Sequence, residues 1–343
     1  MAEATEVTEA AEANASAAAG DAPGGPPGGR ATLAPAPVSG RWSRREAELE
    51  IYEAGVAAGM GNAHDLPLDS HMHTVRSPDA APDALLDAYC ALAVERGIAE
   101  LAITDHVDFD PFAPAYAFSS FEDRERDVRQ AAERWAEHGL AVRFGIELTY
   151  ERRYEDEIRG WLRRHPHDFT IGSVHSGPGS VYEPANVAAF LAGKTLAQAT
   201  APYFDEVVAA ARSGLFDTLG HIDVVKRYLA PHVLPEQFAA QPELYEPALA
   251  ALVDSGTALE VNASGLRQLP RETYPAAPIV ARYLELGGRA VTIGSDTHRL
   301  GWFAYALDVA YRLAASAGVE ALAFRRGGDR VWVPMPPGPT EGA

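Results

Sequence analysis

Histidines and carboxylates stand at the ends of short apolar segments, where their side chains could bind metal ions. The first such segment ends in Asp69-Ser70-His71-Met72-His73 and the last in Asp296-Thr297-His298. Because side chains alternate between the two faces of a strand, His71 and His73 point the same way and can bind one ion together. Between these motifs stand Asp105, His106, Glu147, His175 and His221, so six of the eleven histidines fall at segment ends.

The types of these side chains limit the ions that they would bind. Imidazole and carboxylate ligands without a thiolate suit zinc, manganese or iron, whereas calcium prefers more oxygen ligands. Eight or more ligands exceed what one four-coordinate ion needs, but two or three ions that share a carboxylate would use them all. Because clustered metals clamp the oxygens of a phosphoryl group, the pattern indicates chemistry on a phosphate ester.

Two basic motifs follow later segments and are expected to face the same site. They lie at residues 224–228, which include Lys226 and Arg227, and at residues 263–267, which end in Arg267. Because a guanidinium binds phosphate through two parallel hydrogen bonds, we predict that these three side chains bind a phosphate group outside the metal ions. The alternative for each arginine is a place on a surface loop. The other histidines lie in helical or loop segments and are interpreted as ordinary hydrogen-bonded side chains: His64, His138, His165, His167 and His232.

The spacing of apolar residues predicts the elements that position these side chains. Seven short apolar runs alternate with segments of helical period, which is typical of β–α units around a parallel sheet. The runs cover residues 68–73, 100–106, 141–150, 168–176, 216–225, 257–264 and 290–298. Helices are expected over 83–96, 121–138, 202–213 and 275–286, each followed by a glycine suited to a left-handed cap: Gly97, Gly139, Gly214 and Gly287. The sequence therefore predicts one barrel-like domain whose C-terminal rim carries the candidate ligands.

Composition changes mark the two ends of the chain. Residues 1–40 contain 13 Ala, 6 Gly and 5 Pro with no aromatic residue, so they are predicted to be a disordered tail. Residues 41–66 are predicted to form an appendage, helical over 41–61, with one apolar face made by Trp42, Leu49, Tyr52 and Val56. The main domain is expected over 67–335, with an edge strand at 330–334 after a run at 322–325, and residues 336–343 are expected to be a frayed tail.

Composition also excludes several classes of function. The chain has 343 residues and a net charge of −19 without a basic run, which argues against nucleic acid or an anionic membrane as a partner. Its single cysteine, Cys90, forms no internal disulfide and no thiolate zinc site. No apolar stretch of about 18 residues is present, and the first residues lack the pattern of a signal peptide. We therefore expect a soluble cytoplasmic protein; no heptad pattern predicts its oligomeric state.

Taken in order, the motifs resemble those of the polymerase and histidinol phosphatase (PHP) superfamily. They are HMHT at 71–74, TDH at 104–106, GIE at 145–147, SVH at 173–175, GHID at 220–223 and GSDTH at 294–298. The resemblance implies an α/β fold, a distorted seven-stranded (β/α)7 barrel, in agreement with the seven runs. The segments GHIDVVKRY at 220–228 and LEVNASGLR at 259–267 are most similar to the histidinol-phosphatase branch.

The resemblance also implies which residues share an ion. His71, His73, Glu147 and Asp296 would hold one ion, Glu147 would bridge to a second ion held by His175 and His221, and Asp79, His106 and His298 would hold a third. Asp79 is identified by the resemblance alone, since its position by itself suggests a helix cap. Arg227 and Arg267 would contact the substrate phosphate, with Lys226 beside them. Asp223 and Asp105 are the candidate catalytic residues, and either Asp223 or a metal-bound water is the candidate general acid for the departing alkoxide.

The activity implied is that of a metal-dependent phosphomonoesterase of histidine biosynthesis. Such an enzyme would use two or three divalent ions (Zn, Mn or Fe) and a metal-bridging hydroxide to hydrolyse L-histidinol phosphate to L-histidinol and phosphate. Residues Arg76 and Pro78, the region 183–201 and the long N-terminal segment depart from that branch, and these differences affect the loops that would recognise the leaving alcohol. The alternatives are a PHP phosphatase or phosphodiesterase for another small phosphorylated metabolite or nucleotide, an amidohydrolase, and a non-catalytic metal-binding PHP module.

Overall fold

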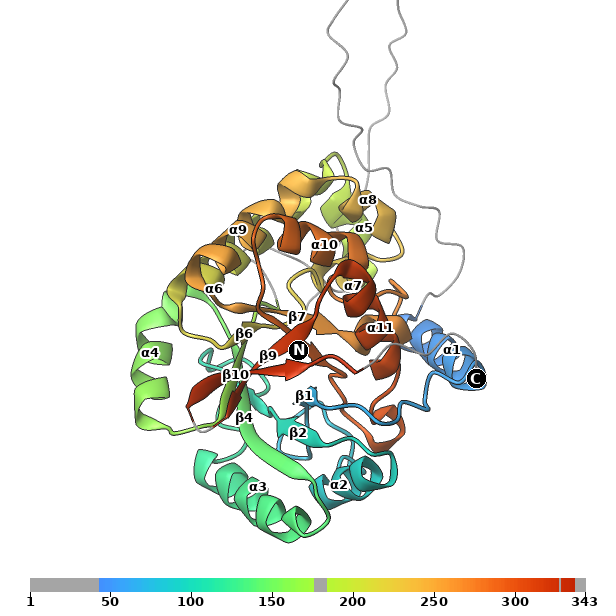
Figure 1. Cartoon of the computed structure of the whole chain (residues 1–343). Helices are drawn as coiled ribbons and strands as arrows, with labels where there is room; N and C mark the ends of the chain where they lie inside the picture. Colours follow the sequence, from blue (N-terminus) through green and yellow to red (C-terminus); the bar gives the residue numbers. More distant parts are fainter. Residues whose placement is uncertain (1–42, 176–183, 327, 337–343) are drawn as a thin grey trace, which may run out of the picture. The chain divides into compact units, whose positions relative to one another are not determined.

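A parallel sheet of short strands forms the centre of the described chain (Figure 1). This computed structural model describes residues 43–175, 184–326 and 328–336. The strands are β1 (Asp69–Met72), β2 (Glu100–Ile103), β3 (His106–Val107), β4 (Ala141–Thr149), β5 (Phe169–Ser173), β6 (Thr218–Leu219), β7 (Ala258–Asn262) and β8 (Val291–Gly294). Every residue of β1, β2, β5, β7 and β8 is buried. Because helices cover a parallel sheet, its strands are buried on both faces and read as nearly continuous apolar runs.

The sheet closes into a nearly complete barrel. The strand order is β1-β2-β4-β5-β6-β7-β8, and all these neighbours are parallel. At the seam between β1 and β8, the Asp296 N–H donates to the His71 carbonyl and the His73 N–H donates to the Thr297 carbonyl, both at 2.8 Å. The distorted seven-stranded barrel is therefore confirmed. One distortion lies in the second predicted run, which divides into β2 and the short β3 that pairs with β4.

Helices surround the barrel (Figure 1). They are α2 (Leu86–Glu95), α3 (Phe121–Ala136), α4 (Glu155–Arg164), α5 (Pro184–Leu191), α6 (Leu196–Ser213), α7 (Val225–Leu229), α8 (Pro235–Ala239), α9 (Glu246–Ser255), α10 (Ala277–Glu285) and α11 (Leu307–Ala317), with 3-10 turns η1 (Arg152–Tyr154), η2 (Pro242–Leu244), η3 (Ala263–Arg267) and η4 (Leu300–Trp302). The predicted cap glycines, Gly97, Gly139, Gly214 and Gly287, all have positive φ. Helix α6 begins before the predicted residue 202 because Thr195 and Gln198 form a capping box.

A further helix, α1 (Arg44–Ala57), precedes the barrel as predicted, but its apolar face was predicted wrongly. Leu49 and Val56 are 51% and 45% exposed, whereas Ile51 and Gly55 are the buried residues of the helix. A Cβ at position 55 would lie 1.7 Å from the Tyr305 Oη, so only glycine allows this close approach. The position of Trp42 and the predicted tails at 1–40 and beyond residue 336 lie outside the described residues.

A hairpin of β9 (Ala321–Arg326) and β10 (Asp329–Pro334) covers the end of the barrel where the strands begin. Phe324 packs on Phe169 at the start of β5, with ring centroids 4.7 Å apart. The Arg325 Nε donates to Asp217, just before β6, at 2.6 Å. The sequence predicted the last strand as an edge strand, but β9 and β10 form a separate antiparallel pair. They close the end opposite to the candidate ligands.

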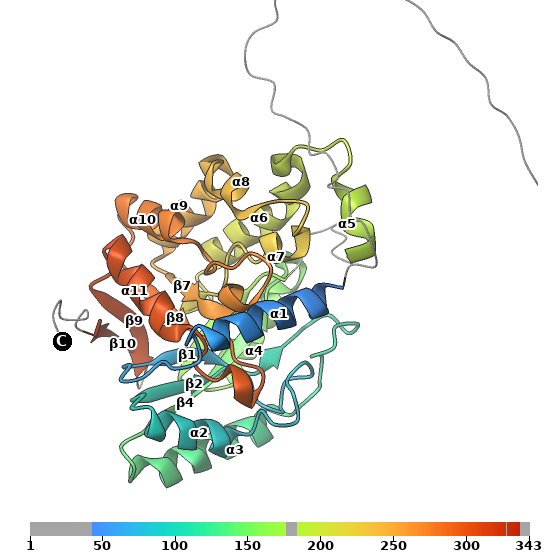
Figure 2. The same ribbon diagram turned by 90° about the vertical axis from the view of Figure 1, so that its right-hand side faces the viewer.

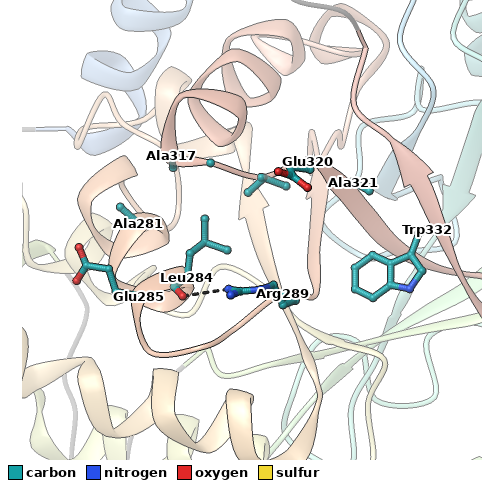
Figure 3. A pocket seen from close by; sticks show the side chains of 10 residues that line it. Ala281, Leu284, Glu285, Arg289, Ala317, Glu320, Ala321 and Trp332 are labelled. Atoms are coloured by element: carbon teal, nitrogen blue, oxygen red, sulfur yellow. Dashed lines mark hydrogen bonds between the residues drawn. The ribbon is translucent and has the colours of Figure 1, made fainter.

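A cavity of about 720 Å³ lies beside this hairpin, between α10, α11 and β10 (Figure 3). Its lining includes Ala281, Leu284, Arg289, Glu320 and Trp332. The Arg289 guanidinium donates to the Leu284 carbonyl at 3.1 Å.

Within the described chain, no helix is both long and apolar enough to cross a membrane.

Candidate metal centre

Two histidines on β1 and the residue after it form the centre of the site. The Nε2 atoms of His71 and His73 are 3.0 Å apart, and both side chains are fully buried. Alternation along the strand directs both rings to the inside of the barrel. Asp296, across the seam on the loop after β8, places its Oδ1 3.8 Å from the His71 Nε2 and 3.6 Å from the His73 Nε2.

Glu147 on β4 lies between the imidazoles. Its Oε2 is 3.4 Å from the His71 Nε2, 3.2 Å from the His73 Nε2 and 2.8 Å from the His106 Nδ1. Its Oε1 is 3.0 Å from the His221 Nε2 and 3.5 Å from the His175 Nε2. One buried carboxylate therefore contacts five imidazoles with its two oxygens.

A third group lies nearer to solvent. Asp79, whose side chain is 57% exposed, places its Oδ2 3.2 Å from the His298 Nε2 and 3.5 Å from the His106 Nε2. The His298 Nδ1 lies 3.0 Å from the Asp296 carbonyl, which directs the Nε2 of the ring toward Asp79. The structure thus brings all nine residues expected to bind metal to the C-terminal rim of the barrel.

The donor set fits metal ions. Sets of three ligand atoms lie within 4.8 Å of one another in His71–His73–Glu147, His71–His221–Asp296, His106–Glu147–His175 and His73–His106–His298. The Glu147 Oε2 is buried and, although the His106 Nδ1 lies 2.8 Å away, it accepts no well-aligned hydrogen bond among the described residues. A buried carboxylate oxygen facing several imidazole nitrogens is what a metal ion would satisfy.

Electrostatics favours the ligating protonation state at His73 and Glu147, whereas at His71, His106 and His221 the neighbouring carboxylates outweigh burial and raise the pKa, so these rings would release a proton on binding a metal ion. Burial, together with the neighbouring charges of His298 and His106, lowers the pKa of His73 well below its usual value. Burial alone would raise the pKa of Glu147, but the positive charges of His106 and His71 hold that pKa well below the usual range. A neutral His73 and an ionised Glu147 are therefore favoured, and these are the ligating forms.

Two residues that were not predicted from the sequence hold the candidate ligands in place. Glu260 on β7 is fully buried, with its Oε1 2.7 Å from the His71 Nδ1 and its Oε2 accepting from the His221 N–H at 2.9 Å. Ser77 places its Oγ 3.2 Å from the His73 Nδ1 and accepts from the His106 N–H at 3.1 Å. Such contacts orient an imidazole and leave its other nitrogen for the ion. Glu260 could have been recognised from the sequence, because a glutamate inside an apolar strand is expected to be buried and a buried charge needs a partner.

Two of the clustered residues have backbone conformations that are uncommon for side chains with a Cβ. His221 has φ +28° and Asp296 has φ +55°. Arg267 supports the second of these, since its Nη1 donates to the Ser295 carbonyl at 2.9 Å and its Nη2 to the Asp296 carbonyl at 2.5 Å. Strained backbone of this kind is often found at functional sites, where surrounding contacts hold it.

The predicted phosphate-binding residues have different surroundings. The Arg227 guanidinium pairs with Glu48 of α1, and both Arg227 and Arg267 line a cavity of about 670 Å³. Lys226 is buried, and its Nζ donates to Asp223 at 2.8 Å, to Glu272 at 2.6 Å and to the Thr273 carbonyl at 3.0 Å.

The two candidate catalytic acids are also buried. Burial raises the pKa of Asp223, although Lys226 opposes the shift. Asp105 accepts hydrogen bonds from the N–H and hydroxyl of Thr74 at 2.7 and 2.8 Å and from the Ser77 hydroxyl at 2.8 Å. Through Ser77, Asp105 supports the ligands His73 and His106.

A second cavity, of about 350 Å³, opens on the clustered ligands. Asp79, His106 and His175 form part of its lining, and acidic side chains form another part: Asp108, Asp110 and Glu151. Asp110 and Glu151 pair with Arg153 at 2.8 and 2.9 Å. For Asp108 the described chain provides no ion pair. The outer wall of this cavity is therefore acidic.

The fold and this cluster together define a class of protein: a β/α barrel whose C-terminal rim carries a cluster of imidazoles and carboxylates suited to metal ions. The model of the PHP domain family matches residues 69–264, more than half of the chain. The protein belongs to the PHP domain family.

Curated relatives carry a more specific name. A probable histidinol-phosphatase of Deinococcus radiodurans is 29% identical over 259 residues, which cover 75% of this chain and 96% of that protein. The histidinol-phosphatase of Lactococcus lactis is 26% identical and is covered to 93%. The crystal structure of the Lactococcus lactis histidinol phosphate phosphatase, complexed with zinc, L-histidinol and phosphate, matches with a TM-score of 0.66 and 25% identity over 77% of this chain and 98% of that one.

Proposed function

We propose that this PHP phosphatase hydrolyses L-histidinol phosphate to L-histidinol and phosphate. The observation that carries the proposal is the arrangement around Glu147, where five imidazoles meet one buried carboxylate at the rim of the barrel. The likeness to a zinc-containing structure that holds L-histidinol and phosphate supports this choice of ester. We assign the activity to residues 67–335, with 41–66 as an appended segment.

We propose three ligand groups. They are His71, His73, Glu147 and Asp296; Glu147, His175 and His221; and Asp79, His106 and His298. When bound, divalent ions would neutralise charge on the phosphoryl oxygens and activate water. The contacts of Glu260 and Ser77 hold the imidazoles in place, so the protein positions these ligands before the substrate arrives.

Arg227 and Arg267 are proposed to bind the phosphate group. Glu48 engages Nε and Nη2 of Arg227, so the Nη1 group retains donors. Arg267 lines the same cavity as Arg227, and its Nε has no hydrogen-bond partner among the described residues, although that atom is buried in this conformation. The Lys226 ammonium already contacts three acceptors, and we propose that Lys226 and Asp223 form a buried ion pair that supports α7.

The acidic wall of the smaller cavity suits a leaving alcohol that carries a positive charge. L-Histidinol has a primary ammonium group, and the Asp108 carboxylate beside His106 is the acidic side chain available to bind it. Asp110 and Glu151 are less suitable because both already pair with Arg153. Asp108 therefore provides a physical reason for selecting a cationic ester.

The test is phosphate release by the purified, metal-analysed protein from L-histidinol phosphate, glycerol phosphate, nucleoside monophosphates and a chromogenic diester. We expect a clear preference for L-histidinol phosphate with two to three ions per chain. Asp108→Asn should raise the KM for this ester and leave that for glycerol phosphate unchanged, with Asp110→Asn as the matched control. A preference for a neutral or nucleotide ester would refute L-histidinol phosphate as the substrate, but it would still be consistent with a phosphatase.

A further inference from the structure

Helix α1 lies outside the segment matched by the family model, yet it contacts the loops that carry the proposed phosphate-binding residues. Figure 2 shows it beside α7. The Arg44 Nη2 donates to the Tyr228 carbonyl at 3.0 Å, and the Tyr52 hydroxyl donates to the Gly301 carbonyl at 2.7 Å. Gly55 packs against Tyr305. The helix is therefore fixed at three places along its length.

Glu48, in the middle of these contacts, forms a two-point ion pair with Arg227 of α7. Its Oε1 accepts from the Arg227 Nε at 2.9 Å and its Oε2 from the Nη2 at 2.8 Å. The Glu48 side chain is 14% exposed, so solvent screens this pair less than it would an exposed one. Parallel hydrogen bonds of this kind fix the plane of a guanidinium as well as its position.

The ion pair leaves Arg227 able to bind an anion. A guanidinium has five N–H groups, and Glu48 uses one on Nε and one on Nη2. Three N–H groups remain on the outer edge, and among the described residues none accepts from Nη1. Glu48 therefore occupies one edge of the guanidinium and leaves the other edge for a ligand.

The cavity that Arg227 lines is cationic. Arg267 and Arg299 line it as well, and their guanidinium carbons lie 4.6 and 4.5 Å from the centroid of the Trp302 ring. Burial lowers the pKa of Arg267, Asp296 opposes that shift, and the positive charge of Arg227 adds to it, so the two arginines repel each other. A carboxylate beside Arg227 offsets that repulsion and allows both arginines to face one cavity.

We propose that Glu48 is a positioning residue of the phosphate-binding site: it holds Arg227 by its inner edge, so that the outer edge faces a phosphate group in the cavity that Arg267 also lines. The proposal rests on the assignment of Arg227 and Arg267 to phosphate. It makes a helix that precedes the family domain a part of the substrate site. The opposite role, in which the Glu48 carboxylate competes with phosphate for Arg227, predicts the opposite change in affinity.

The experiment measures the binding of inorganic phosphate to the metal-loaded full chain by calorimetry, together with KM and kcat. Glu48→Gln should weaken phosphate binding about 10-fold, as loss of a charged hydrogen-bond partner does, and raise KM with kcat changed less than about 2-fold. Glu50→Gln, at an exposed position of the same helix, is the matched control and should change neither. Glu48→Asp keeps the charge but shortens its reach, and should fall between the two.

A double-mutant cycle separates this proposal from the assigned function. If Glu48 acts through Arg227, Glu48→Gln adds less than about 2-fold to the loss caused by Arg227→Ala. Unchanged or tighter phosphate binding in Glu48→Gln, or an undiminished effect in the Arg227→Ala background, would overturn the positioning role. A preference for another ester would refute the assigned substrate, but the affinities of the variants for inorganic phosphate would still test the role of Glu48.

Discussion

The two ends of the barrel are built from the same strands but differ in chemistry. At the C-terminal rim, imidazole and carboxylate atoms lie within 4.8 Å of one another in sets of three, and some of these residues face a cavity. At the opposite end, the β9–β10 hairpin fills the opening with Phe324, and Arg325 and Arg326 pair with Asp217 and Glu100. The adjoining cavity is lined by aliphatic side chains together with Trp332 and three charged residues, Glu285, Arg289 and Glu320 (Figure 3). In this barrel, the candidate functional side chains lie at the C-terminal ends of the strands, and the side chains that close the barrel lie at the N-terminal ends.

The largest effect is expected from Glu147→Gln at the rim. The amide keeps the shape of the side chain but removes the charge that faces five imidazoles, so metal content and turnover should both fall. We expect activity to decrease more than about 100-fold, which is a larger loss than substitution of a residue that only supports the ligands would cause. Metal analysis and steady-state kinetics measure both quantities. Removal of metal by a chelator should reproduce the loss in the wild-type protein.

A smaller effect is expected from Glu260→Gln, one step away from the ions. The Oε1 contact with the His71 Nδ1 fixes the ring, so its loss should weaken metal affinity about 10- to 100-fold. Added metal should then restore activity, which it would not do in Glu147→Gln. A metal affinity equal to that of the wild type would show that Glu260 does not orient His71.

At the closed end, Phe324→Leu should lower the free energy of unfolding by about 1–2 kcal/mol, because a well-packed ring is replaced by a smaller side chain. Its kcat and metal content should match those of the wild type. Denaturant unfolding and kinetics test this together. A loss of turnover in the folded protein would contradict the separation of the two ends.

The smallest expected effect concerns the rate at which a thiol reagent labels Cys90 in α2. This rate measures how often the folded protein opens. Burial, with a contribution from Asp87, raises the pKa of this thiol to about 12, so it stays protonated and shielded at pH 8. Labelling by a thiol reagent should be slow in the wild type and within about 2-fold of it in Glu147→Gln. In Phe324→Leu it should rise with the population of open states. Fast labelling of the wild type would show that the barrel wall opens readily.

The sequence allowed prediction of the barrel and the proposed ligands because both depend on local patterns. A run of apolar residues ending in His71 and His73 fixes the direction of both rings through strand alternation alone. Asp79 needed the family resemblance, since an aspartate in a loop has no distinctive period. Glu260 and Ser77 were missed because their partners are distant in sequence or are contacted through loop geometry.

Helix α1 illustrates a different limit. The helix itself could be predicted from its period, but its buried face could not. That face is set by polar contacts of Glu48 and Tyr52 and by the close approach of Tyr305 to Gly55, none of which follows from an apolar pattern. Contacts of this kind depend on where other loops lie. The length of β6, two residues in place of the predicted ten, has a similar cause, since the chain leaves the sheet at Gly220 to form the GHID turn.

The seam between β1 and β8 has a consequence for the order of folding. The Ser295 N–H donates to the Asp69 carboxylate across 226 positions of the chain, and both flanking segments contribute side chains to the metal centre. Across proteins, folding slows as contacts join residues more distant in sequence, because a longer loop must close before such a contact forms. The complete ligand set can therefore assemble only once the circle of strands is closed, so tight metal uptake would mark the last step in the maturation of the chain.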